Sequence, residues 1–275
     1  MKHRLETMAI LLGAPIAALS TGGCSLATDL DSFESVDGGA TGDAGVECSA
    51  ESEVRRDLVL ELDEFSPHVD EPMEFRVVTD DSPPLLRALA LVNPVDAAMF
   101  TVEMPGAIPA GSHRLEFWAD HDETPGYSPP EDGESFFDAD HSWSIEPCAP
   151  ITRFKHSGDF KIIEDPVGIG SDAQIAFTGM PADLQRFELR VINEDTGATV
   201  GMYRNPVLNS TDFTVVIPDI IDTGLTYTVA FYSDTNDNDA YDAPPTDEAW
   251  EITGITGGVD ETFDYDPDAT TDIGF

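Results

Sequence analysis

The feature that most limits the fold of this chain is an internal duplication of its sequence. FTVEMP, which begins at Phe100, matches FTVVIP, which begins at Phe213. HRLEFWAD, which ends at Asp120, matches YTVAFYSD, which ends at Asp234, and DHSW and DEAW follow in the same order. A spacing of about 110 residues is too long for a solenoid repeat and fits two tandem copies of one domain.

Both copies are predicted to consist of β-strands. Apolar and polar residues alternate in MEFRVV and HRLEFWA of the first copy, and in RFELRVIN and YTVAFYS of the second. Clusters of Pro, Gly and Asp interrupt these segments. About seven short strands in roughly 105 residues are typical of an Ig-like or prealbumin-like sandwich. We therefore predict an all-β protein with two tandem β-sandwich domains, residues 51–152 and 153–275.

The first residues predict export. A short basic segment, residues 2–4, precedes an apolar segment, residues 8–20, that is shorter than the roughly 20 residues needed to span a bilayer. Small residues then lead to Cys24, and this arrangement resembles a bacterial lipobox. The resemblance implies removal of residues 1–23 and a lipid on Cys24, with the protein on the periplasmic or cell-surface face of the outer membrane. Because Thr21 stands where a lipobox has Leu, ordinary signal-peptidase cleavage stays open as an alternative.

Residues 24–50 are predicted to form an acidic, flexible tether. They are mostly small or acidic and contain too few large apolar side chains to form a core. If Cys24 is lipidated, two cysteines remain in an oxidising compartment, and we predict a disulfide between Cys48 and Cys148.

The charge of the chain restricts its partners. It contains 54 acidic and 13 basic residues, a formal net charge of −41. Such a field repels nucleic acid, which is therefore excluded as a partner. Two interpretations of the acidity remain: binding of divalent cations, or adaptation to a salty medium that screens the repulsion.

The loop after the aromatic strand of the second copy contains a candidate calcium site. Asp234, Asn236 and Asn238 alternate along it, so their side-chain oxygens can turn towards one centre. The pattern resembles the calcium loops of dockerins and of Sdr-type B repeats. The resemblance implies Ca²⁺ ligation by these three residues, the carbonyl of Ala240, Asp242 and Asp247. The alternative is a polar hairpin loop that is rich in Asp and Asn for turn geometry alone.

The first copy has a matching loop, for which we predict a weaker site. Asp120 and Asp122 are retained there, and Thr124 and Asp140 are the further candidate ligands. Pro125 cannot adopt the positive φ that the motif needs, so the turn must differ.

Zinc is an alternative ion in the first copy. His113, His121 and His141 lie near these aspartates in the sequence, and imidazole together with carboxylate suits Zn²⁺. The second copy has no histidine at the matching positions.

No motif of a known catalytic machinery appears in the chain. We therefore expect a non-enzymatic lipoprotein with a structural or adhesive role and a protein or glycan ligand. Two alternatives stay open. One is a metal-dependent hydrolase that uses the histidines and aspartates of the first copy. The other is a carbohydrate-binding module with an aromatic platform of Trp118, Tyr127, Tyr232 and Tyr241.

Overall fold

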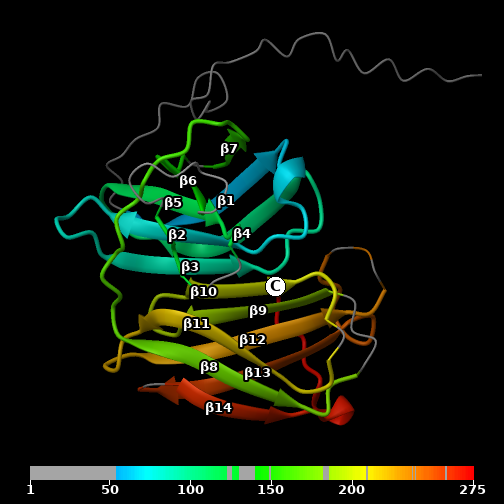
Figure 1. Ribbon diagram of the computed structural model, residues 1–275. Coiled ribbons are helices and arrows are strands. Elements are labelled where there is room, and N and C mark those ends of the chain that lie inside the picture. The colour runs from blue at the N-terminus through cyan, green and yellow to red at the C-terminus, as the bar shows by residue number, and fades with distance from the viewer. Residues whose placement is uncertain are drawn as a thin grey trace, which may run out of the picture. The chain divides into compact units, whose positions relative to one another are not determined.

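The computed structural model describes residues 54–122, 126–129, 140–148, 150–181, 186–208, 210–236, 238, 240–257 and 259–275. Over these residues the protein is all-β, with fourteen strands and no α-helix (Figure 1). This confirms the fold class expected from the alternating sequence pattern. Within the same ranges, no helix has the length and apolar character needed to cross a membrane.

The first half contains seven strands in two layers. One layer has the order β4-β1-β7, in which β1 and β7 are parallel, and the other has the order β3-β2-β5-β6. The bounds are β1 (Arg56–Asp63), β2 (Met73–Thr79), β3 (Leu86–Val92), β4 (Phe100–Ile108), β5 (His113–Ala119), β6 (His141–Ile145) and β7 (Thr152–Lys155).

The second half repeats this topology strand by strand. Its layers have the orders β11-β8-β14 and β10-β9-β12-β13, and β8 and β14 are again parallel. The bounds are β8 (Ser171–Thr178), β9 (Arg186–Asn193), β10 (Ala198–Asn205), β11 (Phe213–Ile221), β12 (Thr226–Asp234), β13 (Glu248–Thr256) and β14 (Val259–Asp264). The duplicated sequence therefore folds into two copies of one seven-stranded topology.

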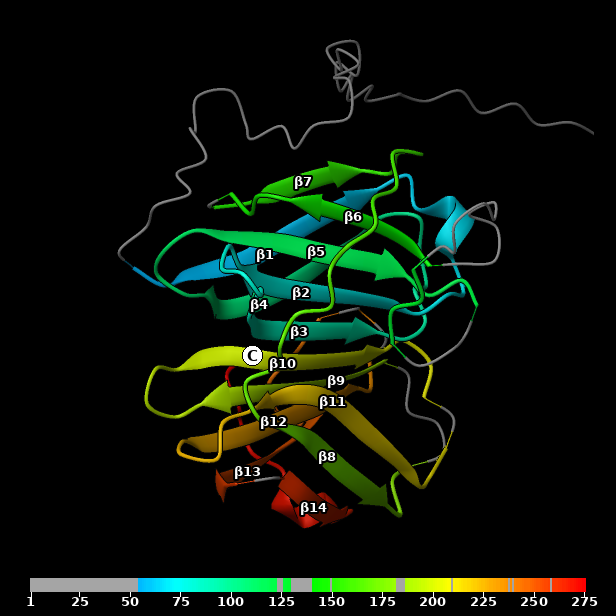
Figure 2. The ribbon, with the colours of Figure 1, turned by 60° about the vertical axis from the view of Figure 1, so that its left-hand side comes forward.

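The two halves share one sheet. Strand β3 pairs in parallel with its counterpart β10, with Leu89 opposite Gly201 and Val92 opposite Arg204. This pairing joins the two four-stranded layers into an eight-stranded sheet of order β13-β12-β9-β10-β3-β2-β5-β6 (Figure 2). These hydrogen bonds make the sheet continuous from one half to the other. The division of the chain into two domains between residues 152 and 153 stays a prediction.

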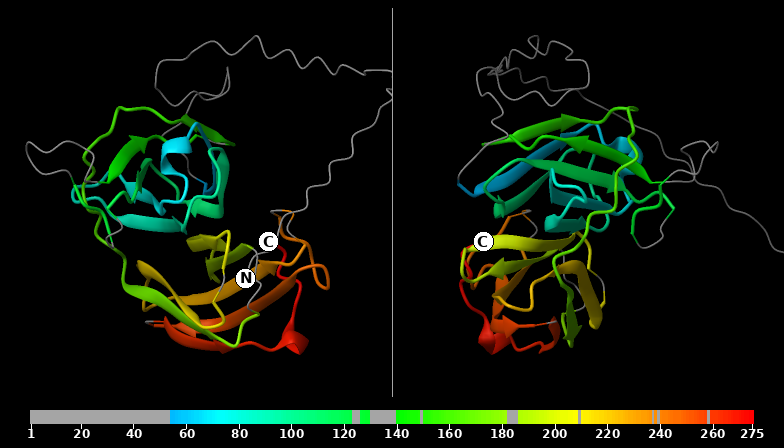
Figure 3. Two further views of the ribbon diagram at one scale, coloured as in Figure 1. Left: turned by 45° about the vertical axis from the view of Figure 1, so that its right-hand side comes forward. Right: turned by 90° about the vertical axis from the view of Figure 1, so that its left-hand side faces the viewer.

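Each half has its own apolar core, and the cores lie on opposite faces of the long sheet. Along β3, Ala88, Ala90 and Val92 belong to the core of the first half, whereas Leu89 belongs to that of the second. Because neighbouring side chains of a strand point to opposite faces, the two three-stranded layers cover opposite sides of the sheet. Figure 2 and Figure 3 show β1 and β4 on one side and β8 and β11 on the other.

A buried group of charged side chains spans the junction. The carboxylate of Glu188 on β9 accepts hydrogen bonds from Arg190 at 3.1 Å and from Arg204 at 3.1 Å. Arg204 also donates to the carbonyl of Thr101 on β4, at 2.7 Å. Burial alone would raise the pKa of Glu188, but Arg204, Arg190 and Arg186 hold it below its ordinary value. Arg204, which is paired with Glu188 in the second half, therefore connects this half to the first through its hydrogen bond to Thr101.

Candidate functional site

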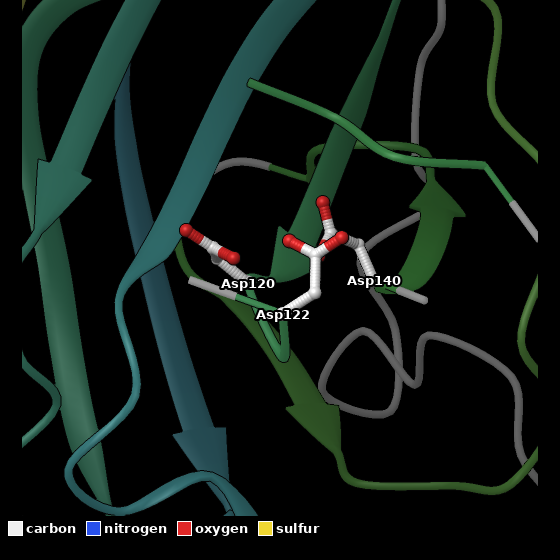
Figure 4. Close-up of side chains that lie close together, drawn as sticks. All are labelled: Asp120, Asp122 and Asp140. Atoms are coloured by element: carbon white, nitrogen blue, oxygen red, sulfur yellow. The ribbon is translucent and has the colours of Figure 1, made fainter. Parts of the chain in front are cut away.

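Three aspartates gather where β5 ends and β6 begins. Asp120 and Asp122 follow β5, and Asp140 directly precedes β6. Each offers one carboxylate oxygen, and these oxygens all lie within 4.8 Å of one another (Figure 4). Asp122 is the most exposed of the three, Asp120 is half-buried and Asp140 is 1% exposed. The structure thus unites three of the four ligands predicted for the first loop; the fourth, Thr124, lies outside the described residues.

Backbone N–H groups fix the orientation of the Asp140 carboxylate. Its Oδ1 accepts from the backbone of His121 at 3.2 Å, and its Oδ2 accepts from the backbone of Ser128 at 2.9 Å. Burial raises the pKa of Asp140 to about 6, and the charges of Asp120 and Asp122 act in the same direction. The ionised form of Asp140 is therefore less stable than that of an ordinary aspartate, and a positive charge nearby would stabilise it.

This arrangement can hold a metal ion. A cation among the three carboxylates would offset both their mutual repulsion and the desolvation of Asp140. Oxygen ligands from carboxylates are those that hard divalent cations prefer.

The second loop also brings its predicted residues together, through hydrogen bonds. The side-chain amides of Asn236 and Asn238 donate to Oδ2 of Asp242, at 2.8 and 2.7 Å. Asp234 accepts from the backbone of Asn238 at 3.4 Å, and the backbone of Ala240 donates to the Asn238 side chain at 3.0 Å. Both amides present N–H groups to Asp242, so a cation at this point would require them to turn their oxygens inward.

Asp247 occupies the place that Asp140 has in the first loop. Its Oδ1 accepts from the backbone of Thr235 at 3.0 Å, and its Oδ2 accepts from the backbone of Asp242 at 2.7 Å. It is 1% exposed. Asp247, like Asp140 in the first half, is thus a buried carboxylate that holds its loop through two backbone hydrogen bonds.

The predicted histidines separate into two places. His113 lies apart on β5, where its Nδ1 is 3.1 Å from the carbonyl oxygen of Gly111. His121 and His141 stack near the three aspartates, with ring centroids 5.3 Å apart. His121 lies 2.9 Å from Glu71, measured from Nδ1 to Oε1.

Two further histidines join this group, and sequence reasoning missed them. His68 and His156 face each other through their Nε2 atoms, 3.1 Å apart. His68 Nδ1 lies 2.7 Å from Oε2 of Glu71. Burial, together with the nearby His68 and His141, lowers the pKa of His156. His68 and His156 lie 88 residues apart along the chain, so no local spacing motif could have connected them.

The aromatic residues proposed as a sugar platform are mostly enclosed. Trp118 is 1% exposed and Tyr232 is 2% exposed. Tyr127 packs against Trp118, and Tyr241 packs against Tyr232, with ring centroids 5.5 and 5.3 Å apart. The two rings that lie on strands therefore cannot stack on a ligand.

The cysteines are described only in part. Cys148 is buried and disulfide-bonded. Its predicted partner Cys48 and the predicted lipidation site Cys24 lie outside the described residues.

Comparison of the chain with protein-family models, with curated proteins and with solved structures finds no match.

Proposed function

We propose that the chain is an exported, non-enzymatic outer-membrane lipoprotein in which Ca²⁺ stabilises a loop of the first β-sandwich. In this proposal a lipid on Cys24 anchors the protein, residues 24–50 act as a tether, and two tandem Ig-like or prealbumin-like domains stand on the periplasmic or cell-surface side. The role is structural or adhesive, with a protein or glycan ligand.

The calcium part of the proposal rests on one observation: Asp120, Asp122 and Asp140 offer three oxygens within 4.8 Å of one another. Asp140 is buried and bonded to the loop that provides the other two carboxylates, so an ion bound here would join the loop to β6. All three ligand atoms are carboxylate oxygens, which favours Ca²⁺ over softer ions. Extracellular calcium modules commonly bind with Kd of about 10⁻⁴–10⁻³ M.

A thermal melt in calcium and in chelator tests the proposal. At 10 mM Ca²⁺, binding at this affinity stabilises the folded protein by about 1.4–2.7 kcal/mol. We therefore expect Tm to rise by roughly 3–10 °C. Asp122→Asn changes the most exposed of the three carboxylates and should abolish most of this rise.

The matched control is Asp242→Asn, which changes an aspartate of the second loop. It should retain the calcium-dependent rise if the ion binds in the first loop. A wild-type Tm that does not respond to Ca²⁺, or an equal response in Asp122→Asn, would contradict the proposal. Loss of the response only in Asp242→Asn would instead assign the ion to the second loop.

A further inference from the structure

A cavity lies at the end of the first sandwich where β1 begins. Its volume is about 470 Å³, within the range of about 300–1,000 Å³ that small-molecule sites occupy. The segment before β1, the end of β2, the strand β3 and the turn from β4 to β5 all contribute to its lining. Its ionisable side chains are those of Arg55, Asp80, Asp81, Arg87 and His113.

The two arginines of this cavity have no carboxylate partner among the residues that the structure describes. Arg55 donates to the backbone carbonyl of Gly106 at 2.5 Å. Arg114, which lies at the same end of the sandwich, is instead paired with Asp80 at 3.6 Å. Burial lowers the pKa of Arg55, and the positive charge of Arg87 acts in the same direction. An anion in the cavity would offset both the burial and the repulsion.

The second half has a glycine, Gly170, at the position of Arg55. Asp57 accepts a hydrogen bond from the backbone of β4 at 2.7 Å, and Asp172 accepts one from the backbone of β11 at 3.1 Å. These matching contacts align Asp57 with Asp172, and therefore Arg55 with Gly170. A Cβ at Gly170 would lie 1.8 Å from the carbonyl oxygen of Ile221, so the second half has no space for a side chain there.

Two apolar core residues of the second half occupy the positions of Arg87 and His113. Arg87 and Val200 both lie at the irregularity of their strand, β3 or β10. The repeated sequence aligns His113 with Tyr227. Val200 and Tyr227 are buried in the core of the second half. The fold therefore closes this end of a sandwich without charged residues, which indicates that those of the first half serve binding.

The cavity also presents acceptors for hydroxyl groups. Nδ1 of His113 lies 3.1 Å from the carbonyl oxygen of Gly111. Burial lowers the pKa of His113, and the charge of Arg87 acts in the same direction, so the neutral imidazole donates from Nδ1 and has its lone pair on Nε2. The carboxylates of Asp80 and Asp81 are further acceptors in the lining. A ligand that fits this lining carries both an anionic group and hydroxyl groups.

We propose that the cavity binds an acidic sugar, a carbohydrate unit that carries a carboxylate. This inference rests on the proposed role with a glycan ligand and names the chemical class of that ligand. The sugar carboxylate accepts from Arg55 and Arg87, because guanidinium groups match the geometry of carboxylates. The sugar hydroxyls donate to Asp80 and to Nε2 of His113. Repulsion by the acidic surface is screened beyond about 8 Å at physiological salt, whereas direct contacts in the cavity are screened much less.

Titration of the full-length chain with D-glucuronate, followed by the NMR signals of the protein at physiological salt, tests the site. D-Glucose lacks the carboxylate and acetate lacks the hydroxyl groups, so these two compounds are the matched controls. We expect saturable binding of glucuronate. Each control should bind about tenfold more weakly or less, because it loses hydrogen bonds that involve charged groups.

Variants locate the ligand. Arg87→Val, which introduces the residue of the second half, should abolish binding. Arg87→Lys keeps the charge but loses the planar fork, and should weaken it. Arg55→Gln provides a second test if Arg87→Val does not fold, as judged by circular dichroism. Arg153→Gln removes an arginine that pairs with Glu61 outside the cavity, and this variant should bind as the wild type does.

Several outcomes would overturn the proposal. They are absence of glucuronate binding by the wild type, equal binding of glucose or acetate, and unchanged binding in a folded Arg87→Val or Arg55→Gln variant. Loss of binding in Arg153→Gln would also overturn it, because overall charge would then account for the effect. The calcium-dependent rise of Tm, measured on the same samples, separates the two proposals. No sugar binding with an intact rise contradicts the sugar site alone, and sugar binding without the rise contradicts the calcium site alone.

Discussion

Asp140 and Asp247 hold equivalent positions in the two halves, and each binds two backbone N–H groups of the loop that precedes it. Asp140 accepts from His121 and Ser128, and Asp247 accepts from Thr235 and Asp242. Each aspartate is buried and directly precedes a strand, β6 or β13. A buried tryptophan, Trp143 or Trp250, follows three residues later. The two loops thus share a mechanism of attachment, although their other residues differ.

Removal of the buried Asp247 carboxylate should destabilise the protein. Asp247→Ala leaves the N–H groups of Thr235 and Asp242 without their acceptor, and an unsatisfied buried donor costs about 1–3 kcal/mol. We expect the urea midpoint to fall accordingly, measured by tryptophan fluorescence. Asp96→Asn, at an exposed position, should leave the midpoint unchanged. An Asp247→Ala midpoint equal to that of the wild type would show that water replaces the carboxylate without cost.

The raised pKa of Asp140 predicts a pH dependence of stability in chelator. Its pKa is about 6 in the folded protein and about 3.8 in the unfolded chain, so between these values only the folded state binds the proton. The contribution of Asp140 to stability is therefore full below about pH 4 and is lost as the pH rises through about 6. The free energy of unfolding of the wild type, relative to Asp140→Asn, should fall over this interval. A difference that stays constant with pH would contradict the assignment, and saturating Ca²⁺ should reduce the fall.

Glu74 on β2 and Glu188 on β9 are equivalent residues whose pKa values shift in opposite directions. We therefore expect their replacement by Gln to lower the free energy of unfolding by unequal amounts. Burial raises the pKa of Glu74, and Arg76 only partly offsets it, whereas three arginines hold the pKa of Glu188 low. Glu188→Gln should cost about 3–5 kcal/mol at neutral pH, because it leaves buried arginines without their carboxylate. Glu74→Gln should cost much less.

The same pair differs in the direction of its pH dependence. The contribution of Glu188 is present above its unfolded pKa and is lost as the pH falls through the lower folded value. The contribution of Glu74 is present at low pH and is lost as the pH rises through its higher folded value. Guanidinium unfolding of both variants across the acidic range measures this, and parallel curves for the two would refute it.

Gly201 on β10 packs closely against two isoleucine side chains at the junction of the halves. A Cβ at this position would overlap Cδ1 of Ile220 and lie 3.3 Å from Cδ1 of Ile217, and both isoleucines are buried. Gly201→Ala should therefore destabilise the protein by about 1–3 kcal/mol through overpacking. Gly158→Ala is the matched control, since a Cβ there meets no atom within 4 Å. Equal thermal midpoints for the two variants would show that the isoleucines rearrange freely.

Local sequence pattern was sufficient for the strands and for part of the site. Alternation in segments such as His113–Ala119 and Thr226–Asp234 places one set of side chains in the core, and both are strands. The duplicated D-x-x-W element identified Asp140 and Asp247 as residues of the candidate loops, because each copy has an aspartate three residues before a tryptophan. Both aspartates are buried in the structure. These features depend on residues close together in the chain.

Strand β3, which pairs with β10, has a sequence signal of burial on both faces. The segment LRALALV, Leu86–Val92, is apolar at almost every position, which is typical of a strand buried on both faces. Such a strand needs a core on each side, and the second core comes from the other half. The pattern indicated burial on two faces, but it does not say which strand would pair with the exposed edge.

The sequence by itself thus determined an all-β chain of two similar halves with acidic loops after their aromatic strands. The alternation of apolar and polar residues in a strand, and the composition of a loop, can be recognised from neighbouring residues without knowledge of the fold. Only the tertiary structure decided that the halves share one sheet with cores on opposite faces, and that Glu71 lies between His68 and His121. These contacts join residues far apart in the chain, and their formation depends on how edges and cores pack, which no local periodicity encodes.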